Sequence, residues 1–311
     1  MTRSCPVCDS GDVNAIAAYR NTDKVFSGLA IAECGVCGMA FAEPMPSKDH
    51  LAAYNASYFT SAHGGIPTSV AAQAFFSGIA RLRVACLETY LGSRHASTVS
   101  TVMEFGPGPG FFATAWLERH PGTTYLASET DTSCHARLTK SGIKLVDDAF
   151  STDAEAAGSV DLVVMSHVLE HVSAPRDFIR DATQKLRKGG VLFIEVPCRD
   201  YLHKSIDEPH LLFFDKKPMR HLLEVSGFED IELGYFGREI DALRSESALR
   251  SKWMSLRSRL IDKGLIWPFS RKRDGMEILT DPLERAAVAP FEAHCEISAP
   301  AWWLRAMARK R

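Results

Sequence analysis

Four cysteines near the start of the chain form two closely spaced pairs, and their spacing predicts a metal site. The pairs are Cys5/Cys8 and Cys34/Cys37, each with two residues between the cysteines. A C-x2-C turn can aim two thiolates at one point, so two such turns supply the four sulfurs of a tetrahedral zinc site. Four cysteine ligands leave no open position, so we expect the zinc to be structural and to help fold a small segment. Reduced structural cysteines and an iron–sulfur cluster are the alternatives.

A glycine-rich turn at 104–110, between a predicted strand and a predicted helix, could receive a ligand close to its backbone. It contains Gly106, Gly108 and Gly110. The dinucleotide-binding spacing G-x-G-x-x-G would require glycine at 111, where this chain has Phe111, and the Gly-Lys-Ser/Thr end of a phosphate loop is absent. Glu104, at the end of the strand, suits an ammonium group better than a pyrophosphate.

Acidic residues also end the next two predicted strands. Glu129 lies 19 residues after Gly110 and can accept hydrogen bonds from both hydroxyls of a ribose. Asp148 can accept a hydrogen bond from an adenine amino group, and Thr130 and Ala149 adjoin these positions. A glycine turn, a ribose carboxylate and an adenine acceptor, in this order, predict a nucleoside-type cofactor.

These side chains need a sheet to position them, and the chain alternates strands with helices from residue 99 onward. Regular alternation of this kind implies a parallel sheet with helices on both faces. The apolar run at 160–166 is typical of a strand that is buried on both sides. We predict core strands at 98–105, 124–128, 143–146, 160–166, 191–196, 229–235 and 294–298 and helices at 69–93, 110–120, 131–141, 175–186 and 216–226, with short strands at 31–33 and 39–41.

Composition excludes several classes of protein. The chain has 311 residues, of which 46% are hydrophobic and 24% charged, so it is neither disordered nor a disulfide-dense miniprotein. Its net charge of −2 argues against broad nucleic-acid binding. The first residues lack a signal-peptide pattern and we identify no apolar run of membrane-span length. We therefore expect a cytoplasmic protein without a membrane span.

The motifs as a set resemble the class I S-adenosylmethionine-dependent methyltransferases. The resemblance rests on 104–110, Glu129, Asp148-Ala149, 161–172 and 186–197, and it covers roughly residues 75–236 plus the final strand. It implies an α/β, doubly wound, Rossmann-like sheet of seven mostly parallel strands, the last one antiparallel. It also implies S-adenosylmethionine as cofactor. The expected cofactor-binding residues are Glu104, Gly106, Gly108, Gly110, Glu129, Thr130, Asp148, Ala149, Ser166 and His167.

The resemblance divides the chain into four parts. We expect a zinc ribbon at 1–45, a linker with an N-terminal helix at 46–98, a methyltransferase core at 99–237 and 292–311, and a helical insert at 238–291. Aromatic residues at 54–59 are interpreted either as a packed surface loop or as a flap over a ligand. The insert holds ten Lys/Arg and four acids between 238 and 273, and is interpreted as a solvated helix face or as a lid over an anionic substrate.

Histidines are the candidate catalytic groups. Methyl transfer is an in-line displacement in which the enzyme aligns the acceptor, and the sulfonium leaving group requires no metal. A general base adds roughly 10²–10⁴-fold. His210 is the first candidate, ahead of His171 and of His167, which is expected beside the cofactor; each is otherwise a structural histidine. The segment around His210 is similar to one in sugar and small-molecule methyltransferases with a zinc ribbon, but Pro209 interrupts the Glu-His pair of those that methylate carbon.

The expected acceptor is a small polar or anionic molecule, such as a nucleotide-linked sugar, a polysaccharide precursor or a specialised metabolite. A ribosomal-RNA methyltransferase is the first alternative, because some of these enzymes also begin with a zinc ribbon. Their Asn/Asp-Pro-Pro-aromatic segment is replaced here by the sequence Ser-His-Val-Leu at 166–169. Salt-sensitive retention of RNA would favour this alternative. The second alternative is a non-catalytic binding module, which binds the cofactor and turns over no acceptor.

Overall fold

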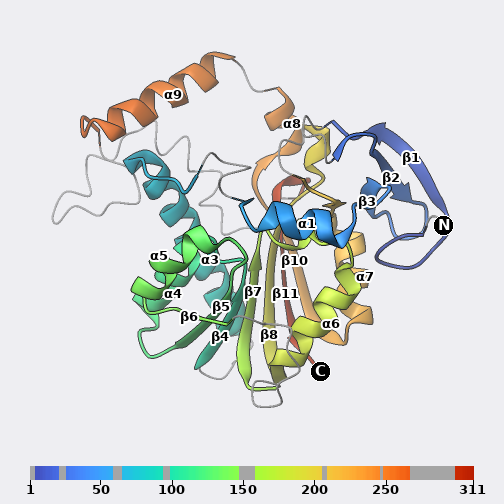
Figure 1. Cartoon of the computed structure of the whole chain (residues 1–311), viewed down its shortest axis with the longest axis horizontal. Coiled ribbons are helices and arrows are strands. Elements are labelled where there is room, and N and C mark those ends of the chain that lie inside the picture. The colour runs from blue at the N-terminus through green and yellow to red at the C-terminus, as the bar shows by residue number, and fades with distance from the viewer. Residues whose placement is uncertain are drawn as a thin grey trace.

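A seven-stranded sheet forms the centre of the molecule (Figure 1). The computed structural model describes residues 4–20, 26–58, 65–93, 99–146, 158–204, 209–245, 248–266 and 298–311. In the order of the sheet, the strands are β10 (Phe228–Glu239), β11 (Ala301–Lys310), β8 (Leu186–Pro197), β7 (Val160–Ser166), β4 (Thr101–Phe105), β5 (Thr124–Ser128) and β6 (Lys144–Leu145). Strand β11 runs antiparallel to both neighbours, whereas the strands from β8 to β6 are parallel. The predicted α/β sheet, with an antiparallel last strand, is confirmed.

Helices cover both faces of this sheet (Figure 1). One face carries α3 (Val70–Ser93), α4 (Phe111–Arg119) and α5 (His135–Lys140), and the 3-10 helix η2 (Thr132–Cys134) precedes α5. The other face carries α6 (Pro175–Lys185) and α7 (Lys216–Val225). Each face buries a separate hydrophobic cluster, because β-strand side chains alternate between the two sides of the sheet. The predicted helices at 69–93, 110–120, 175–186 and 216–226 are therefore present.

A second, smaller sheet has the strand order β1-β2-β3-β9 and is antiparallel throughout. Its strands are β1 (Val13–Ala18), β2 (Ala30–Cys34), β3 (Ala40–Glu43) and β9 (Leu212–Phe213). The last of these belongs to the core segment and lies 169 residues or more beyond β3 in the sequence (212 − 43 = 169). We call the described residues up to Glu43, with the cysteine turns and strands β1 to β3, the N-terminal unit. This unit therefore shares a sheet and a hydrophobic cluster with the core.

The position of the last core strand was predicted wrongly. The strand is Ala301–Lys310 and not 294–298; Ser298 precedes it, and residues 294–297 lie outside the described residues. Arg305 and Arg309 interrupt the apolar pattern of this segment, and such a pattern does not predict a strand inside a sheet. Arg305 is nevertheless 2% exposed, because its Nε donates a 2.5 Å hydrogen bond to Oε2 of Glu195 on β8.

Two other boundaries also differ from the prediction. Strand β8 begins at Leu186 and not at 191, because Leu186 pairs with Val160 before the register shift between the two strands. The linker contains a helix, α1 (Lys48–Asn55), whose N-cap Ser47 accepts a hydrogen bond from the backbone of His50. Figure 1 shows α1 lying across one edge of the large sheet.

The insert begins with two helices, α8 (Ile240–Arg244) and α9 (Ala248–Asp262). Oδ1 of Asp262 accepts a 2.9 Å hydrogen bond from the backbone of Ala71 at the start of α3. The rest of the insert that was predicted, 267–291, lies outside the described residues.

Within the described residues, one stretch, Val70–Gly92 in α3, is long and apolar enough to cross a membrane by length and composition. This is weak evidence, because the core helices of soluble proteins pass the same test. Ile79, Val84 and Leu87 of this helix are buried in the cluster against α4 and the sheet.

The two arginines of β11 offer a test of the buried charge pair. Arg305→Ala leaves a buried carboxylate short of one partner, so the free energy of unfolding should fall by about 3 kcal/mol. Arg309, on the same strand, pairs at the surface with Glu229 and Asp230, and Arg309→Ala should lower stability by less than about 1 kcal/mol. Urea unfolding of both variants measures the difference, and equal losses would contradict this account of β11.

Candidate functional site

The glycine turn packs tightly against two neighbouring elements. Gly106 and Gly110 have φ angles of +62° and +77°, a region that side-chain-bearing residues rarely adopt. A Cβ atom on Gly106 would lie 2.7 Å from Cγ2 of Val168, and one on Gly110 would lie 2.7 Å from Cδ2 of Leu138. The turn is thus held between the end of β7 and α5, and any other residue at these two positions would displace it.

The predicted ribose carboxylate is in contact with this turn. Oε2 of Glu129 accepts a 2.8 Å hydrogen bond from the backbone of Gly108, and Oε1 accepts one from the backbone of Asp131 at 2.8 Å. Burial raises the pKa of Glu129. The next residue, Thr130, is exposed, and its hydroxyl donates to the carbonyl of Asn55 in α1 at 3.4 Å. The structure therefore brings the glycine turn and the end of β5 into contact.

Glu104 lies beneath the turn at the end of β4. Its side chain is buried, and Oε2 accepts a 2.6 Å hydrogen bond from the hydroxyl of Tyr125. Burial raises the pKa of Glu104 to about 7, although the hydrogen bond from Tyr125 opposes the shift. The two remaining predicted positions, Asp148 and Ala149, lie outside the described residues.

The end of β7 contributes Ser166 and His167. No described residue hydrogen-bonds to the buried hydroxyl of Ser166. His167 has a φ of +58°, which turns the chain sharply at the edge of the sheet. Its Nδ1 lies 3.2 Å from Oε1 of Glu170, and its Nε2 lies 3.5 Å from Oε1 of Glu195. Burial would lower the pKa of His167, but these two carboxylates raise it overall.

Glu195 joins β8 to two arginines that the sequence analysis did not select. Nε of Arg83, from α3, donates to Oε1 of Glu195 at 2.7 Å, and Arg305 donates to Oε2. Burial would raise the pKa of Glu195, but the two guanidinium groups hold it well below its usual range. The sequence did contain a sign of this ion pair. A single acid interrupts the apolar run 191–196, and a single arginine interrupts the apolar run 301–308.

Behind His167 lies a buried cluster of three residues, Glu170, His171 and His210. One ligand atom from each lies within 4.8 Å of the others. Glu170 and His171 belong to the 3-10 helix η3 (Leu169–His171), directly after β7, and the rings of His171 and His210 are 4.9 Å apart. The structure thus groups the three predicted catalytic histidines, because His167 contacts Glu170. His167 is 34% exposed at its side chain, whereas His210 is 1% exposed as a residue.

Two hydrogen bonds orient the imidazole rings of this cluster. Nδ1 of His210 lies 2.7 Å from Oδ2 of Asp200, in the 3-10 helix η4 (Asp200–Leu202), and Nδ1 of His171 lies 3.3 Å from the carbonyl of Pro209. Burial would raise the pKa of Asp200, but the charge of His210 and its hydrogen bond lower it to about 2. The sequence analysis did not select Asp200, which is ten residues from His210 and becomes its neighbour only through the fold.

The N-terminal unit holds the backbone around His210. The hydroxyl of Tyr19 donates to the carbonyl of His210 at 2.9 Å, and the backbone of Ala42 donates to Leu211 at 2.8 Å. Leu211 in turn donates to the carbonyl of Glu170 at 2.7 Å, and β3 pairs with β9 immediately beyond. The N-terminal unit thereby fixes the backbone beside the buried cluster.

Aromatic residues of the linker reach the same place. The ring of Tyr58 meets His171 edge to face at 5.4 Å, and Tyr54 lies 6.2 Å from Tyr58. These contacts place the two rings beside the buried cluster, and the choice between a packed loop and a flap stays a prediction. The remaining residues of that segment, 59–64, lie outside the described residues.

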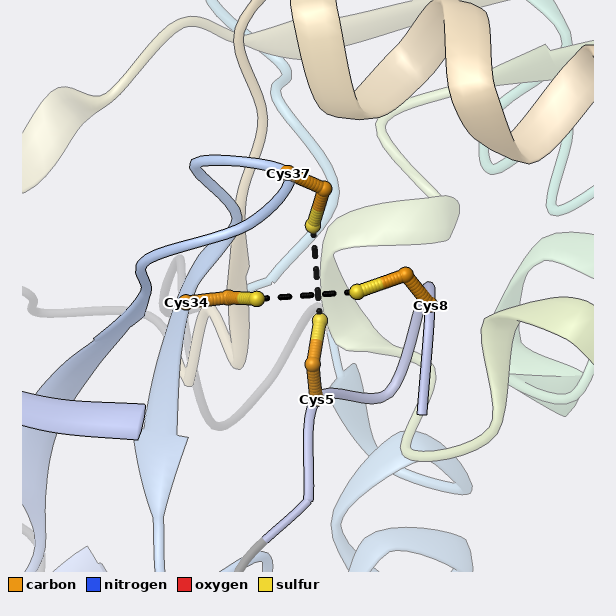
Figure 2. A group of neighbouring side chains, drawn as sticks. All are labelled: Cys5, Cys8, Cys34 and Cys37. Atoms are coloured by element: carbon orange, nitrogen blue, oxygen red, sulfur yellow. Dashed lines mark hydrogen bonds between the residues drawn. The ribbon is translucent and has the colours of Figure 1, made fainter. Parts of the chain in front are cut away.

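The four cysteines point toward a common centre (Figure 2). The Sγ atoms of Cys5 and Cys37 are 3.5 Å apart, as are those of Cys8 and Cys34, and all four lie within 4.8 Å of one another. Four sulfurs about 2.3 Å from one zinc ion lie roughly 3.8 Å apart in a tetrahedron. The four thiols therefore fit a tetrahedral zinc ion.

Comparison with known proteins places the core in a broad group. A family model described as a methyltransferase domain matches residues 76–233. An uncharacterized methyltransferase of Mycobacterium sp. (strain JLS) is 35% identical over 115 residues, which are 36% of this chain and 42% of that protein. A protein of Mycolicibacterium smegmatis, described as a probable S-adenosylmethionine-dependent methyltransferase, is 26% identical over 167 residues, which are 51% of this chain and 65% of that protein.

The chain thus spans less than two thirds of the length of these curated relatives. Among solved structures, a SAM-dependent methyltransferase from Thermotoga maritima is similar, with a TM-score of 0.48 and 15% identity, over 77% of this chain and 91% of that one.

The contact between Gly106 and Val168 predicts a large difference between two glycine substitutions. Gly106 and Gly142 both have positive φ angles, but a Cβ atom on Gly142 would meet nothing within 4 Å. Gly142→Ala should lower the free energy of unfolding by about 1–2 kcal/mol, through backbone strain alone. Gly106→Ala should lower it by about 1–3 kcal/mol more, because the new methyl group overpacks the turn. Thermal unfolding of both variants measures this, and similar melting temperatures would refute the tight packing of the turn.

Proposed function

Because this chain belongs to the methyltransferase domain family, we propose that it transfers a methyl group from S-adenosylmethionine to a small polar acceptor. The observation on which this depends most is the hydrogen bond from the backbone of Gly108 to Glu129, with Glu104 buried below the same turn. Together these residues present one carboxylate for a ribose and another for an ammonium group. Both groups belong to S-adenosylmethionine.

In the proposed complex, each end of the cofactor has its own partners. Glu104 binds the ammonium group of the methionine part, and the glycine turn lets the cofactor approach the backbone. Glu129 accepts hydrogen bonds from the ribose hydroxyls. Glu104 is buried, so a bound ammonium group would stabilise its ionised form. Ser166 and His167 lie at the end of β7, where open α/β sheets bind their ligands.

The acceptor is proposed to be a hydroxyl-bearing molecule such as a nucleotide-linked sugar, a polysaccharide precursor or a specialised metabolite. Its oxygen attacks the methyl carbon in line with the sulfur; the O–C bond forms as the C–S bond breaks, and the bonding pair remains on sulfur. The acceptor hydroxyl gives its proton to water, and S-adenosylhomocysteine leaves. The polar groups at this edge of the sheet, His167 and Arg83 among them, support a polar acceptor. The histidine base predicted from the sequence stays a prediction.

We also propose that Cys5, Cys8, Cys34 and Cys37 hold a structural zinc ion. Four thiolates complete its coordination, so its role is to fix the two cysteine turns and the strands between them. Strand β2 ends at Cys34, and β3 follows Cys37 by three residues. A zinc ion here would therefore stabilise the strand that pairs with β9.

Variants of the glycine turn test the proposed cofactor. Glu129→Ala removes both the ribose acceptor and the hydrogen bond to Gly108, and Gly108→Asp places a negative side chain in the turn. Each should weaken binding of S-adenosylmethionine and S-adenosylhomocysteine at least tenfold in calorimetric titration. Glu118→Ala, at an exposed site on α4, should leave affinity unchanged. Unchanged affinity in Glu129→Ala would overturn the assignment of the cofactor site.

Metal analysis tests the proposed zinc site. The purified chain should contain one zinc ion per molecule by plasma mass spectrometry, and Cys34→Ser should lower both the zinc content and the melting temperature. Cys86→Ser, which also alters a buried thiol but lies on α3, should keep its zinc. Wild-type protein that folds without zinc or iron at this site would contradict the proposal.

A further inference from the structure

We propose that Glu170, His171 and His210 bind a divalent transition-metal cation, and that this cation binds the acceptor oxygen that is methylated. The second half of the proposal rests on the proposed function, whereas the metal site does not. The three residues are distinct from the four cysteines, and each offers one ligand atom within 4.8 Å of the other two.

The chemistry of the donor set suits a cation with open positions. Two imidazoles and one carboxylate are the protein ligands of many catalytic zinc sites and of mononuclear iron sites, in which water or substrate completes the coordination. A four-cysteine site differs in this respect, because it is closed. The mixed nitrogen and oxygen donors favour a first-row divalent ion such as Mn²⁺, Fe²⁺ or Zn²⁺ over Ca²⁺, which prefers oxygen ligands alone.

Both histidines are oriented as metal ligands commonly are. A metal-binding histidine usually donates its other ring N–H to a carboxylate or a backbone carbonyl. Nδ1 of His210 faces Asp200 at 2.7 Å, and Nδ1 of His171 faces the carbonyl of Pro209 at 3.3 Å. Donation from Nδ1 leaves the lone pair on Nε2, which is then the atom that can bind a cation.

Glu170 supplies an independent observation. Its residue is 0% exposed, and no described residue donates a hydrogen bond of good geometry to either carboxylate oxygen. Nδ1 of His167 lies 3.2 Å from Oε1, and this imidazole is charged only when it is protonated. A buried carboxylate is unfavourable unless charge or hydrogen bonds compensate it. A divalent cation between Glu170 and the two imidazoles would supply that compensation.

The cluster lies next to the proposed cofactor. Val168, which packs against Gly106 of the glycine turn, is two residues before Glu170. A cation bound here lowers the pKa of a hydroxyl that it coordinates, so the acceptor O–H loses its proton to solvent water. The oxygen then attacks the methyl carbon as the C–S bond breaks. With three protein ligands, a five- or six-coordinate cation has room for two neighbouring acceptor oxygens, as a vicinal diol would offer. His171 and His210 are then ligands and not bases.

Titration with Mn²⁺ of protein that carries a single zinc ion per chain, at the cysteine site, tests the second site without reference to turnover. Free Mn²⁺ gives a six-line paramagnetic resonance signal that is lost on binding, so the number of bound ions can be counted. We expect one Mn²⁺ per wild-type chain and at least tenfold weaker binding in Glu170→Gln and His171→Ala. The matched control Glu224→Gln, on the exposed side of α7, should bind like the wild type.

The two proposals fail in distinguishable ways. Wild-type chain that binds no Mn²⁺, or variants that bind it with wild-type affinity, would overturn the metal site, and a metal-independent His210 base would then account for the cluster. Binding of Mn²⁺ without binding of S-adenosylmethionine would leave the site standing and overturn the proposed function. The wild-type count decides the matter even if a variant does not fold. With diol acceptors, turnover should rise at least tenfold on adding Mn²⁺ to chelator-treated enzyme that retains its zinc; no rise would overturn the catalytic half.

Discussion

The pairing of β3 with β9 is the constraint on which the candidate site depends. β9 has only two residues, and it lies between His210 and α7 in a segment without other strand partners among the described residues. Its partner β3 comes from the N-terminal unit, and that unit also provides Tyr19, whose hydroxyl binds the carbonyl of His210. A two-residue strand is too short to be stable alone. The position of His210 therefore depends on a partner strand that begins 172 residues before β9 in the chain (212 − 40 = 172).

A second set of interactions fixes the opposite side of the site. Glu195 on β8 binds Arg83 from α3 and Arg305 from β11, and it also faces His167. Buried charges are unfavourable alone, but here each guanidinium compensates the same carboxylate. One ion cluster thus joins the last strand, a central strand and the long helix at the edge where the ligand is expected. Tyr19 and β3 contact the segment of His210, whereas this ion cluster contacts His167.

The sequence was sufficient for the parts that follow local patterns. Strand–helix alternation predicted the large sheet. The glycine turn and Glu129 were selected as parts of one cofactor site, and the structure shows a hydrogen bond between them. What could not be predicted depends on long-range pairing. The strand at 301–310 was missed because Arg305 breaks its apolar pattern, and only the fold reveals Glu195 as its partner. The same holds for Asp200 and for β9, whose partners lie elsewhere in the chain.

The dependence of His210 on the N-terminal unit can be measured by hydrogen exchange followed by mass spectrometry. The comparison is between zinc-loaded protein and protein whose cysteine site has been emptied by a chelator. Loss of the metal should increase exchange in peptides covering 40–43 and 209–214, while peptides from β7 keep their protection. If the metal is lost and the 209–214 segment remains as protected as before, then the N-terminal unit does not hold His210 in place.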